Sequence, residues 1–369
     1  MALLRARCGQ HAGGRDNSTA RLDHGDIVHN ILVTGGAGFI GSQTCKALSR
    51  AGYLPVTYDD MSRGHAWAVR WGPLERGNIA DADRMREVIN RYRPEAVIHF
   101  AGYGYVGESM ESPDLYYGNN VIRTGLMLET LRLCDVRNIV FSSSCATYGG
   151  VHDRAIDETV EQRPLSTYGF SKLVVERMLS DYGRAFGFRS LALRYFNAVG
   201  ADPDGELGES HDPEPHFLPR VLRTAAGQEP FIALNGDDYP TSDGTCVRDY
   251  VHVHDLAHGH VLAVQAVIDG GTTGAINLGT GRGSSLLEII QVARRVTGRN
   301  IATEFWPRRD GDPAYAVADA RRAALVLGWK AAYTDMDQIV AHSWRWMCNG
   351  AHRVREVTIE PRAGTESVR

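Results

Sequence analysis

A glycine-rich turn that follows an apolar run is the feature that most constrains how this chain can fold. Ile31 to Thr34 read as a buried strand, and the next residues place glycines at Gly35, Gly38 and Gly41. The first glycine suits a tight turn, the second lets the backbone approach a pyrophosphate, and the third allows a helix to pack closely on the strand. The spacing therefore predicts the opening unit of a dinucleotide-binding fold, with a helix from Ile40 to Arg50. A glycine turn between any strand and helix is the plainer alternative.

A second apolar strand supports the dinucleotide interpretation. It covers Leu54 to Tyr58 and ends at Asp59 and Asp60, about 20 residues beyond the glycines, where an acid binds the adenosine ribose of NAD. Arg63 offers an alternative, because an arginine here can meet the 2′-phosphate of NADP. Since Asp59 would repel that phosphate, NAD is the expected cofactor.

Strand and helix signals alternate along the first half of the chain. Apolar strands are expected at Ala96–Phe100, Asn138–Ser142 and Ser190–Tyr195, and helices at Ala82–Tyr92, Asn120–Cys134 and Tyr168–Phe186. This alternation predicts an α/β protein with a Rossmann-type doubly wound parallel sheet.

Two domains are expected, because 369 residues exceed the length of most single domains. The alternation loosens after residue 200, where proline, glycine, aspartate and histidine become frequent. The expected parts are a flexible extension over 1–29, a dinucleotide domain over 30–199, a smaller α/β substrate-binding domain over 200–348 that exchanges some chain with the first, and a tail over 349–369. A mitochondrial presequence is the alternative for residues 1–29, weakened by their acidic side chains.

Composition and charge narrow the class of protein. A net charge of −4 disfavours nucleic acid or an anionic membrane as the main partner. No apolar run reaches the length of a bilayer span. The cysteines, at positions 8, 45, 134, 145, 246 and 348, form no Cys-x-x-Cys pair. They fit inert thiols in a reducing compartment, so a cytoplasmic location is expected.

Three side chains make a candidate catalytic set. Tyr168 and Lys172 are four residues apart, so on a helix they share a face and the ammonium can favour the phenolate. Ser144 ends an expected strand, and ligands of an open α/β sheet bind beyond the carboxyl ends of its strands. Such a set can hydrogen-bond a substrate hydroxyl and move its proton while a hydride goes to NAD. Taken singly, a Tyr-x-x-x-Lys spacing arises by chance and a strand-end serine is often a turn former.

Metal binding is not expected. The histidines at positions 252, 254, 258 and 260 lie close together with Asp255. Histidines that alternate on a strand and then a helix more often serve packing or lie on the surface, so a metal hydrolase is the weaker reading.

At this point the chain resembles a known family. It is similar to the extended short-chain dehydrogenases/reductases, and within them to the UDP-glucose 4-epimerases. The motifs that carry the resemblance are Thr34–Gly41, His99–Gly102, Val106–Ser109, Tyr116–Val121, Ser142–Gly149, Tyr168–Lys172, Leu193–Asn197 and Asp243–Val253. The resemblance covers roughly residues 30 to 348 and is far more specific in the later motifs than in the glycine loop.

The resemblance implies a role for each member of the catalytic set. Tyr168 would be the base and acid for the sugar 4-hydroxyl. Lys172 would bind the nicotinamide ribose and depress the pKa of Tyr168, and Ser144 would help to move the proton. The sugar would be oxidised at C4 to a keto intermediate, turn about its link to the diphosphate, and take the hydride back on its other face. Because there is no net redox change, NAD would stay bound.

The resemblance also implies two sets of contacts. The cofactor set is Gly35, Gly38, Phe39, Ile40, Gly41, Asp59, Asp60, Asn78, Ile79, Phe100, Ala101, Gly102, Asn119, Ser142, Tyr168, Lys172 and Tyr195. The UDP-sugar set is Ser144, Tyr168, Asn197, His216, Arg248, Arg309, Asp312 and Ala316. Arginines suit a diphosphate because their planar fork meets phosphate oxygens in pairs. A homodimer formed through helices of the cofactor domain is also implied.

Three positions depart from the family pattern. Gly104 stands where many relatives have a lysine near the cofactor, and Tyr103 or Tyr105 could replace that contact. Asn78 stands in place of an aspartate that accepts from adenine, and its carbonyl can still accept. Ser166 and Thr167 precede Tyr168 where a proline is frequent, and Thr167 is the expected helix cap.

The sugar itself stays open at this stage. Ala316 stands where a bulky residue in some relatives excludes N-acetyl sugars, so alanine leaves room. UDP-glucose and UDP-galactose are the first expectation, with UDP-N-acetylhexosamines or UDP-xylose and UDP-arabinose as alternatives. A 4,6-dehydratase would need an acidic pair where Cys145 and Ala146 stand, and a non-catalytic NAD sensor would have lost Tyr168 or Lys172.

Overall fold

A seven-stranded sheet in which every neighbouring pair is parallel forms the larger of two units in the computed structural model. The structure describes residues 29–150, 154–271, 273–309 and 312–350. Nearly all of the expected extension and tail therefore lies outside the described residues. The strand order is β10-β6-β5-β4-β1-β2-β3. The strands are β1 (Asn30–Thr34), β2 (Leu54–Asp59), β3 (Leu74–Arg76), β4 (Ala96–His99), β5 (Asn138–Ser144), β6 (Arg189–Tyr195) and β10 (Gly274–Leu278).

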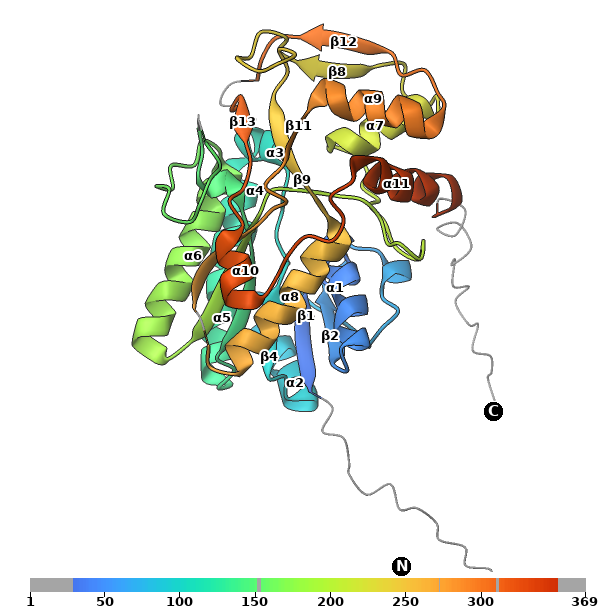
Figure 1. Ribbon diagram of the computed structural model, residues 1–369. Helices are drawn as coiled ribbons and strands as arrows, with labels where there is room; N and C mark the ends of the chain where they lie inside the picture. Colours follow the sequence, from blue (N-terminus) through green and yellow to red (C-terminus); the bar gives the residue numbers. More distant parts are fainter. Residues whose placement is uncertain (1–28, 151–153, 272, 310–311, 351–369) are drawn as a thin grey trace, which may run out of the picture.

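Helices cover both faces of this sheet, so the predicted Rossmann-type α/β class is confirmed (Figure 1). The helices of the larger unit are α1 (Phe39–Arg50), α2 (Ala82–Tyr92), α3 (Val106–Glu111), α4 (Pro113–Tyr116), a π-helical segment (Tyr117–Arg123), α5 (Thr124–Leu133), α6 (Thr167–Phe186), α8 (Val253–Ile268) and α10 (Arg321–Leu327). Two short 3-10 turns cover Ala66–Ala68 and Cys145–Thr147.

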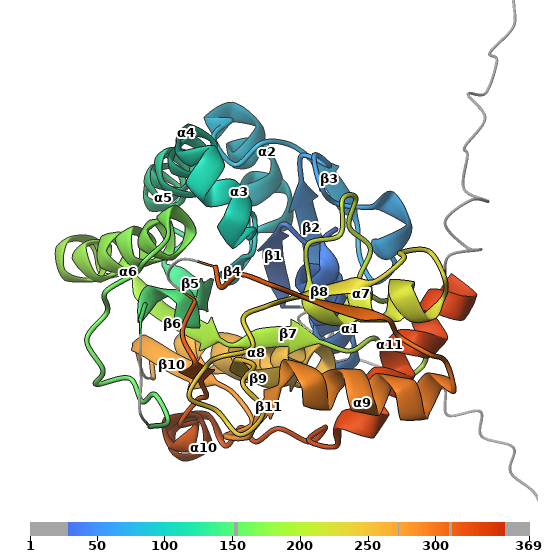
Figure 2. The ribbon, with the colours of Figure 1, turned by 90° about the horizontal axis from the view of Figure 1, so that it is seen from above.

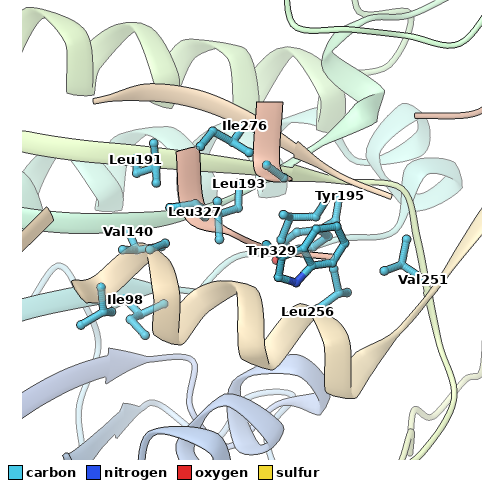
Figure 3. Packing of buried hydrophobic residues seen from close by; sticks show 14 of the residues in the cluster. Ile98, Val140, Leu191, Leu193, Tyr195, Val251, Leu256, Ile276, Leu327 and Trp329 are labelled. Atoms are coloured by element: carbon cyan, nitrogen blue, oxygen red, sulfur yellow. The ribbon is translucent and has the colours of Figure 1, made fainter. Parts of the chain in front are cut away.

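Alternation of side chains along each strand divides the core into two layers. Ile31 and Val33 of β1 pack in one cluster with residues of α1, α8 and α10, whereas Leu32 packs in another with residues of α2, α5 and α6. Successive strand residues point to opposite faces of a sheet, which explains this division. Figure 3 shows part of the first cluster, where Trp329 lies close to Leu256 and Tyr195.

The smaller unit lies beyond the carboxyl ends of the parallel strands (Figures 1 and 2). Its strands are β7 (Asn197–Val199), β8 (Ile232–Asn235), β9 (Val247–His252), β11 (Gly283–Ser285), β12 (Thr303–Trp306) and β13 (Tyr315–Ala316). β9 pairs with β7, β11 and β13, and β8 pairs with β12. Helices α7 (Phe217–Ala225), α9 (Leu286–Thr297) and α11 (Met336–Gly350) enclose a third apolar cluster.

The two units exchange chain more than once. β10 comes from the second half of the sequence but pairs in parallel with β6 at the edge of the large sheet. α8 likewise packs on α1 and on β5. The chain first crosses between β6 and β7, shortly before the expected boundary at residue 199, and it crosses again several times later. Within the described ranges, no helix combines the length and apolar character that a bilayer span needs.

Candidate active site

The glycine loop between β1 and α1 has three positions with different constraints. Gly35 has φ +73°, and a Cβ there would lie 2.5 Å from the Ala101 nitrogen. At Gly41 a Cβ would lie 2.3 Å from the Gly35 oxygen. Gly38 is different, because its nearest neighbour would be the Gly35 oxygen at 3.4 Å, an ordinary contact. The protein's own packing thus requires glycine at the first and last positions and leaves open space in front of Gly38.

Helix α1 begins at this open space. Gly38 is its N-cap, no described side chain caps it, and its first turn holds no acid. The amide groups at the start of a helix have no partner within the helix, and the helix dipole adds positive potential there. The loop and the helix start therefore form a cradle that suits an anionic pyrophosphate.

Asp59 at the end of β2 is tied to the glycine loop. Its carboxylate accepts from the Ala37 nitrogen at 3.0 Å and from the Met61 nitrogen at 2.9 Å. Burial raises the pKa of Asp59, and these two backbone hydrogen bonds oppose that rise. A carboxylate has about four lone-pair sites, so capacity for the expected ribose hydroxyl remains.

The other residues expected at the adenosine end lie together on the far side of β2. Asn78 donates to Asp60 at 3.1 Å and accepts from the Ala80 nitrogen at 3.0 Å through its own carbonyl. Ile79 beside it is buried. The Asn78 carbonyl therefore uses one lone pair for the Ala80 nitrogen and keeps a second for the predicted acceptor role.

The end of β4 lies directly beside the glycine loop. The nitrogens of Phe100 and Ala101 donate to the Thr34 carbonyl at 2.9 and 3.0 Å. A Cβ on Gly102 would lie 3.7 Å from the Lys172 nitrogen, so this end of the strand borders the catalytic set. Asn119 donates to Asn120, whose own side chain is bonded to Tyr103 and Ser171.

The catalytic set converges from β5 and α6, as the sequence predicted. Lys172 is buried and donates to the Ser142 carbonyl at 2.8 Å, and its nitrogen lies 5.8 Å from the centre of the Tyr168 ring. Ser144 ends β5 and accepts from the Ala146 nitrogen, and its hydroxyl lies close enough to Tyr168 to oppose the rise in the pKa of that phenol. The fold thus brings the hydroxyl of Ser144 to the phenol of Tyr168 and the ammonium of Lys172, which are more than twenty residues away in the sequence.

The protein's own groups raise the pKa of Tyr168 rather than lower it. Burial disfavours the phenolate and raises its pKa to about 12, although the Ser144 hydrogen bond opposes this. Burial also lowers the pKa of Lys172 to about 8, against the pull of Glu176. The depression expected from Lys172 does not outweigh burial, because the ammonium is directed to the Ser142 carbonyl. Nearby, Ser142 and Tyr195 are hydrogen-bonded through their hydroxyls, and burial raises the pKa of Tyr195.

The cap of α6 differs from the expectation. Ser166, not Thr167, is the N-cap, and its hydroxyl accepts from the Gly169 nitrogen at 3.1 Å. The predicted cap at Thr167 is therefore wrong by one residue. Thr167 is already the first residue of the helix. The N-cap is therefore the residue before it, whose side chain accepts from a free amide of the first turn.

Part of the expected UDP-sugar set gathers around β9. Arg248 donates to Asp312 at 2.8 Å, and Ala316 of β13 pairs with Arg248 in the strand register. Arg309 is exposed, and its carbonyl accepts from the Asp312 nitrogen at 3.2 Å. Asn197 is exposed on β7, next to β9.

His216 belongs to a cluster of glutamates and histidines that the sequence analysis did not single out. It is the N-cap of α7, and its Nδ1 lies 2.6 Å from Glu209 and 3.2 Å from Glu214. His211 lies 3.2 Å from Glu209. The sequence hints at this cluster only through the glutamates and histidines that recur at positions 209, 211, 214 and 216. Such a recurrence is too common to predict a cluster by itself.

Two of the histidines considered for a metal are engaged with other groups of the protein. His252 is hydrogen-bonded to His342 and stacks on Tyr333, while His260 bonds the Leu256 carbonyl. In the described part of the chain, the side chains close enough to share an ion are Glu209, His211, Glu214 and His216, and separately Asp202, Asp204 and Glu206. The second group surrounds the Lys46 ammonium, and Arg50 and Arg70 also pair with two of its carboxylates, so three cations already balance the three acids.

Comparison with known proteins agrees with this geometry. Residues 31–279 match the NAD dependent epimerase/dehydratase family. A UDP-glucose 4-epimerase of Rhizobium meliloti (strain 1021) is 45% identical over 318 residues, which are 86% of this chain and 97% of the relative.

Solved structures are similar over the same extent. The crystal structure of UDP-glucose 4-epimerase from Brucella ovis in complex with NAD has 51% sequence identity and a TM-score of 0.84, over 86% of this chain and 98% of that one. A UDP-glucose-4-epimerase from Stenotrophomonas maltophila, with bound NAD and formylated UDP-arabinopyranose, has 38% identity and a TM-score of 0.85, over 88% and 99%.

The parallel sheet, the glycine cradle and the Ser, Tyr and Lys side chains define the class as dinucleotide-binding proteins of the short-chain dehydrogenase/reductase type. Within that class, the extent of the similarity decides the family. The chain belongs to the UDP-glucose 4-epimerase family.

Proposed function

We propose that this chain is an isomerase that catalyses the NAD-dependent 4-epimerisation of a UDP-sugar. The observation that carries the proposal is the convergence of Ser144, Tyr168 and Lys172 beside the glycine loop, in a chain that belongs to this family. UDP-glucose and UDP-galactose are the first substrates to test, as in the names of the relatives.

The residues present fit NAD. The open space at Gly38 and the uncapped start of α1 suit the pyrophosphate, and Asp59 with Asp60 suits an unphosphorylated adenosine ribose. When bound, NAD supplies the acceptor and donor of the hydride at sugar C4. The Brucella and Stenotrophomonas relatives hold NAD.

Tyr168 is the candidate acid and base for the sugar 4-hydroxyl. Its pKa of about 12 is too high for a base at neutral pH, so a positive charge near the phenol must stabilise the phenolate during turnover. Lys172 provides one such charge from a fixed position on Ser142, and the positively charged nicotinamide ring provides a second. Ser144 stands at the end of β5 close to Tyr168, where its hydroxyl can pass the proton.

The nucleotide diphosphate is assigned to the second unit. Arg248 is mostly buried and already directed by Asp312 and by the Pro313 carbonyl at 2.7 Å. Arg309 lies three residues before Asp312 in the sequence and is exposed. Two arginines there would supply paired donors to phosphate oxygens, and Asn197 and His216 complete the proposed contacts.

The range of sugars depends on the space at Ala316. This side chain is small and buried beside Arg248, so it sets no bulky wall. An apolar wall discriminates by only about 1–3 kcal/mol, so one pocket can serve several sugars. UDP-N-acetylglucosamine and UDP-xylose are therefore the alternatives to test beside UDP-glucose.

A homodimer is part of the proposal. Its support is an apolar helix face, defined by the exposed residues Ile122, Leu126 and Leu133, whose spacing puts them on one side of the π-helical segment and α5. Exposed apolar patches of this kind mark association surfaces. We also infer a cytoplasmic location, since Cys45, Cys134, Cys145, Cys246 and Cys348 are free thiols.

The test is to mix the purified protein, without added NAD, with UDP-glucose, UDP-N-acetylglucosamine or UDP-xylose and to follow the anomeric proton signals by NMR. A 4-epimer at equilibrium is expected with at least UDP-glucose, and the rates rank the sugars. No epimer with any sugar, even after NAD is supplied, would refute the proposal. A 4-keto product would point to a dehydratase instead.

A further inference from the structure

Two glutamates and two histidines stand close together on the loop between β7 and α7. Each offers one donor atom, and these four atoms all lie within 4.8 Å of one another. The members of this Glu–His cluster are Glu209, His211, Glu214 and His216. Carboxylate oxygen and imidazole nitrogen are both common metal ligands in proteins, so the cluster is a candidate for an ion site.

The two carboxylates of the cluster are buried side by side. The exposed fraction of the side chain is 7% for Glu209 and 2% for Glu214. In the described ranges, the only basic side chains within ion-pair distance of either carboxylate are His211 and His216. Buried negative charges need a compensating positive charge. That charge is either carried by protons on the two histidines or supplied by a metal cation.

The distances within the cluster suit a tetrahedral metal ion. An ion that binds nitrogen and oxygen at about 2.0–2.2 Å keeps its ligand atoms about 3.3–3.6 Å apart. Nδ1 of His211 lies 3.2 Å from Glu209 and 3.6 Å from Glu214, and Nδ1 of His216 lies 3.2 Å from Glu214. The fourth separation, 2.6 Å between His216 and Glu209, is shorter. Donors spaced in this way can bind one ion with little movement of the loop.

One donor of the cluster has no partner within the described part of the protein. Nδ1 of His211 is buried and makes no hydrogen bond, although two carboxylates lie near it. A buried polar atom without a partner is unfavourable, so it indicates a ligand. The Tyr105 ring packs edge-on against His211 and His216, with ring centres 5.7 Å apart in both pairs. This packing holds both imidazoles in position for an ion.

We propose that the Glu–His cluster binds one divalent transition-metal ion, with Zn²⁺ as the expected occupant. Two nitrogens and two oxygens in a tetrahedral arrangement suit Zn²⁺, whereas Mg²⁺ and Ca²⁺ prefer shells made of oxygen. The four protein ligands leave no open position, so the ion is structural and takes no part in the proposed reaction. It ties the loop to the start of α7, where His216 is the N-cap.

The exposure of the cluster allows an ion to enter. The His216 side chain is 43% exposed, in contrast to the two carboxylates. Since its Nδ1 faces the cluster, its Nε2 stays available for the proposed sugar contact. This site is also separate from the histidines of β9 and α8, for which no metal was expected.

The experiment measures Zn²⁺ binding to the full-length protein without an affinity tag. The protein is stripped with a chelator and titrated with ZnCl₂, and the metal content per chain is measured by mass spectrometry, with Mg²⁺ and Ca²⁺ as competitors. Co²⁺ in place of Zn²⁺ reports the geometry, because tetrahedral Co²⁺ absorbs visible light far more strongly than octahedral Co²⁺.

Two variants remove a ligand, and two matched controls do not. Glu209→Gln and His211→Gln each delete one donor of the cluster. The controls are Glu206→Gln, in the acidic group around Lys46, and His258→Gln, at an exposed position of α8. Each control makes the same chemical change as its partner at a site that should not hold the ion.

The wild type should bind one Zn²⁺ per chain that excess Mg²⁺ does not displace, and its Co²⁺ form should have a tetrahedral spectrum. The two ligand variants should bind Zn²⁺ at least about tenfold more weakly than the controls. Zn²⁺ should raise the unfolding temperature of the wild type and of both controls, because it binds the folded state, and should raise that of the ligand variants less.

Three results would overturn the proposed metal site. The stripped wild type could take up no Zn²⁺, both ligand variants could bind Zn²⁺ as tightly as their controls, or the Co²⁺ form could be octahedral. A loss of Zn²⁺ in Glu206→Gln alone would move the ion to the group around Lys46 and overturn it as well. If one ligand variant does not fold, the other variant and the wild-type Co²⁺ spectrum still decide.

Discussion

The ammonium of Lys172 donates to the main-chain carbonyl of Ser142, two residues before Ser144, at 2.8 Å. The lysine is thus fixed to the strand and not to the phenol. Its nitrogen lies 5.8 Å from the centre of the Tyr168 ring. This arrangement leaves the phenol hydroxyl available for a substrate hydroxyl.

Replacing Tyr168 with phenylalanine should reduce turnover while leaving the fold intact. The variant lacks the proton-transfer group but keeps the ring, so we expect about a 10²–10⁴-fold lower kcat. The measurement is NMR of epimer formation, with NAD content as a check on the cofactor site. Tyr182→Phe on the same helix is the control and should stay near wild type. Retention of more than a tenth of wild-type turnover in Tyr168→Phe would argue against the assigned role.

Two glycines of the cofactor loop should respond differently to alanine. Gly35→Ala forces a positive φ on alanine and places its Cβ 2.5 Å from the Ala101 nitrogen, so we expect a loss of at least about 2 kcal/mol of unfolding free energy. Gly38→Ala makes only an ordinary contact and should cost less than about 1 kcal/mol, yet lose NAD. Denaturant unfolding and NAD content measure both. Equal destabilisation of the two variants would contradict this difference.

The Glu214–His216 pair should stabilise the metal-free protein in a defined pH window. Burial alone would raise the pKa of Glu214, but His211 and His216 lower it to about 2. Burial alone would lower the pKa of His216, but Glu209 and Glu214 raise it to about 10. The Glu214 contribution is present above its unfolded pKa of about 4.5 and is lost as pH falls through about 2. The His216 contribution is present below about 6.5 and is lost as pH rises through about 10.

Glu214→Gln tests this window by denaturant unfolding at several pH values, with a chelator present. Because His216 is partly exposed, we expect the variant to be only about 1–2 kcal/mol less stable than wild type near pH 6. The difference should shrink as pH approaches 10. A difference that stays constant from pH 6 to 10 would show that the carboxylate acts through packing rather than charge.

The apolar helix face should hold two copies of the chain together. Leu126→Lys places a charge in its middle, and we expect a shift from dimer to monomer in sedimentation or size-exclusion measurements. Leu325→Lys on α10 is the matched control, because Leu325 is 86% exposed and lies elsewhere. A monomeric wild type, or equal behaviour of both variants, would refute the assigned interface.

A larger side chain at position 316 should narrow the range of sugars. Ala316→Tyr adds an aromatic ring beside Arg248, so activity on UDP-N-acetylglucosamine should fall about 10–200-fold relative to UDP-glucose. Competition between the two sugars, followed by NMR, gives the ratio directly. An unchanged ratio would place the sugar elsewhere.

Local patterns account for what the sequence predicted well. The expected strands and helices of the first half agree with the structure to within a few residues at each end, because their apolar periods are regular. The strand β10 was missed since its partner β6 ends 79 residues before it begins, and only tertiary packing brings the two together. β3 is too short to give a periodic signal.

The site residues also fall into those that a local pattern predicts and those that it does not. Tyr168 and Lys172 follow from helical spacing, and Gly35 follows from the turn that it makes. Other contacts depend on how loops pack together in the folded protein. Examples are the pairing of Arg63 with Glu108, 45 residues apart, and the cluster of Glu209, Glu214 and His216. No local pattern encodes such contacts. The burial that raises the pKa of Tyr168 is likewise a property of the folded surroundings.

The chain returns to the large sheet to place β10 beside β6. This topology limits where the protein can be truncated and which parts can be exchanged with a relative. A fragment that stops near residue 199 would expose the unpaired edge of β6 and the sheet surface that α8 covers, which invites aggregation. The smaller unit is therefore not a detachable module. Exchanging it between relatives by a single crossover would succeed only if α8 and β10 travel with a matching sheet.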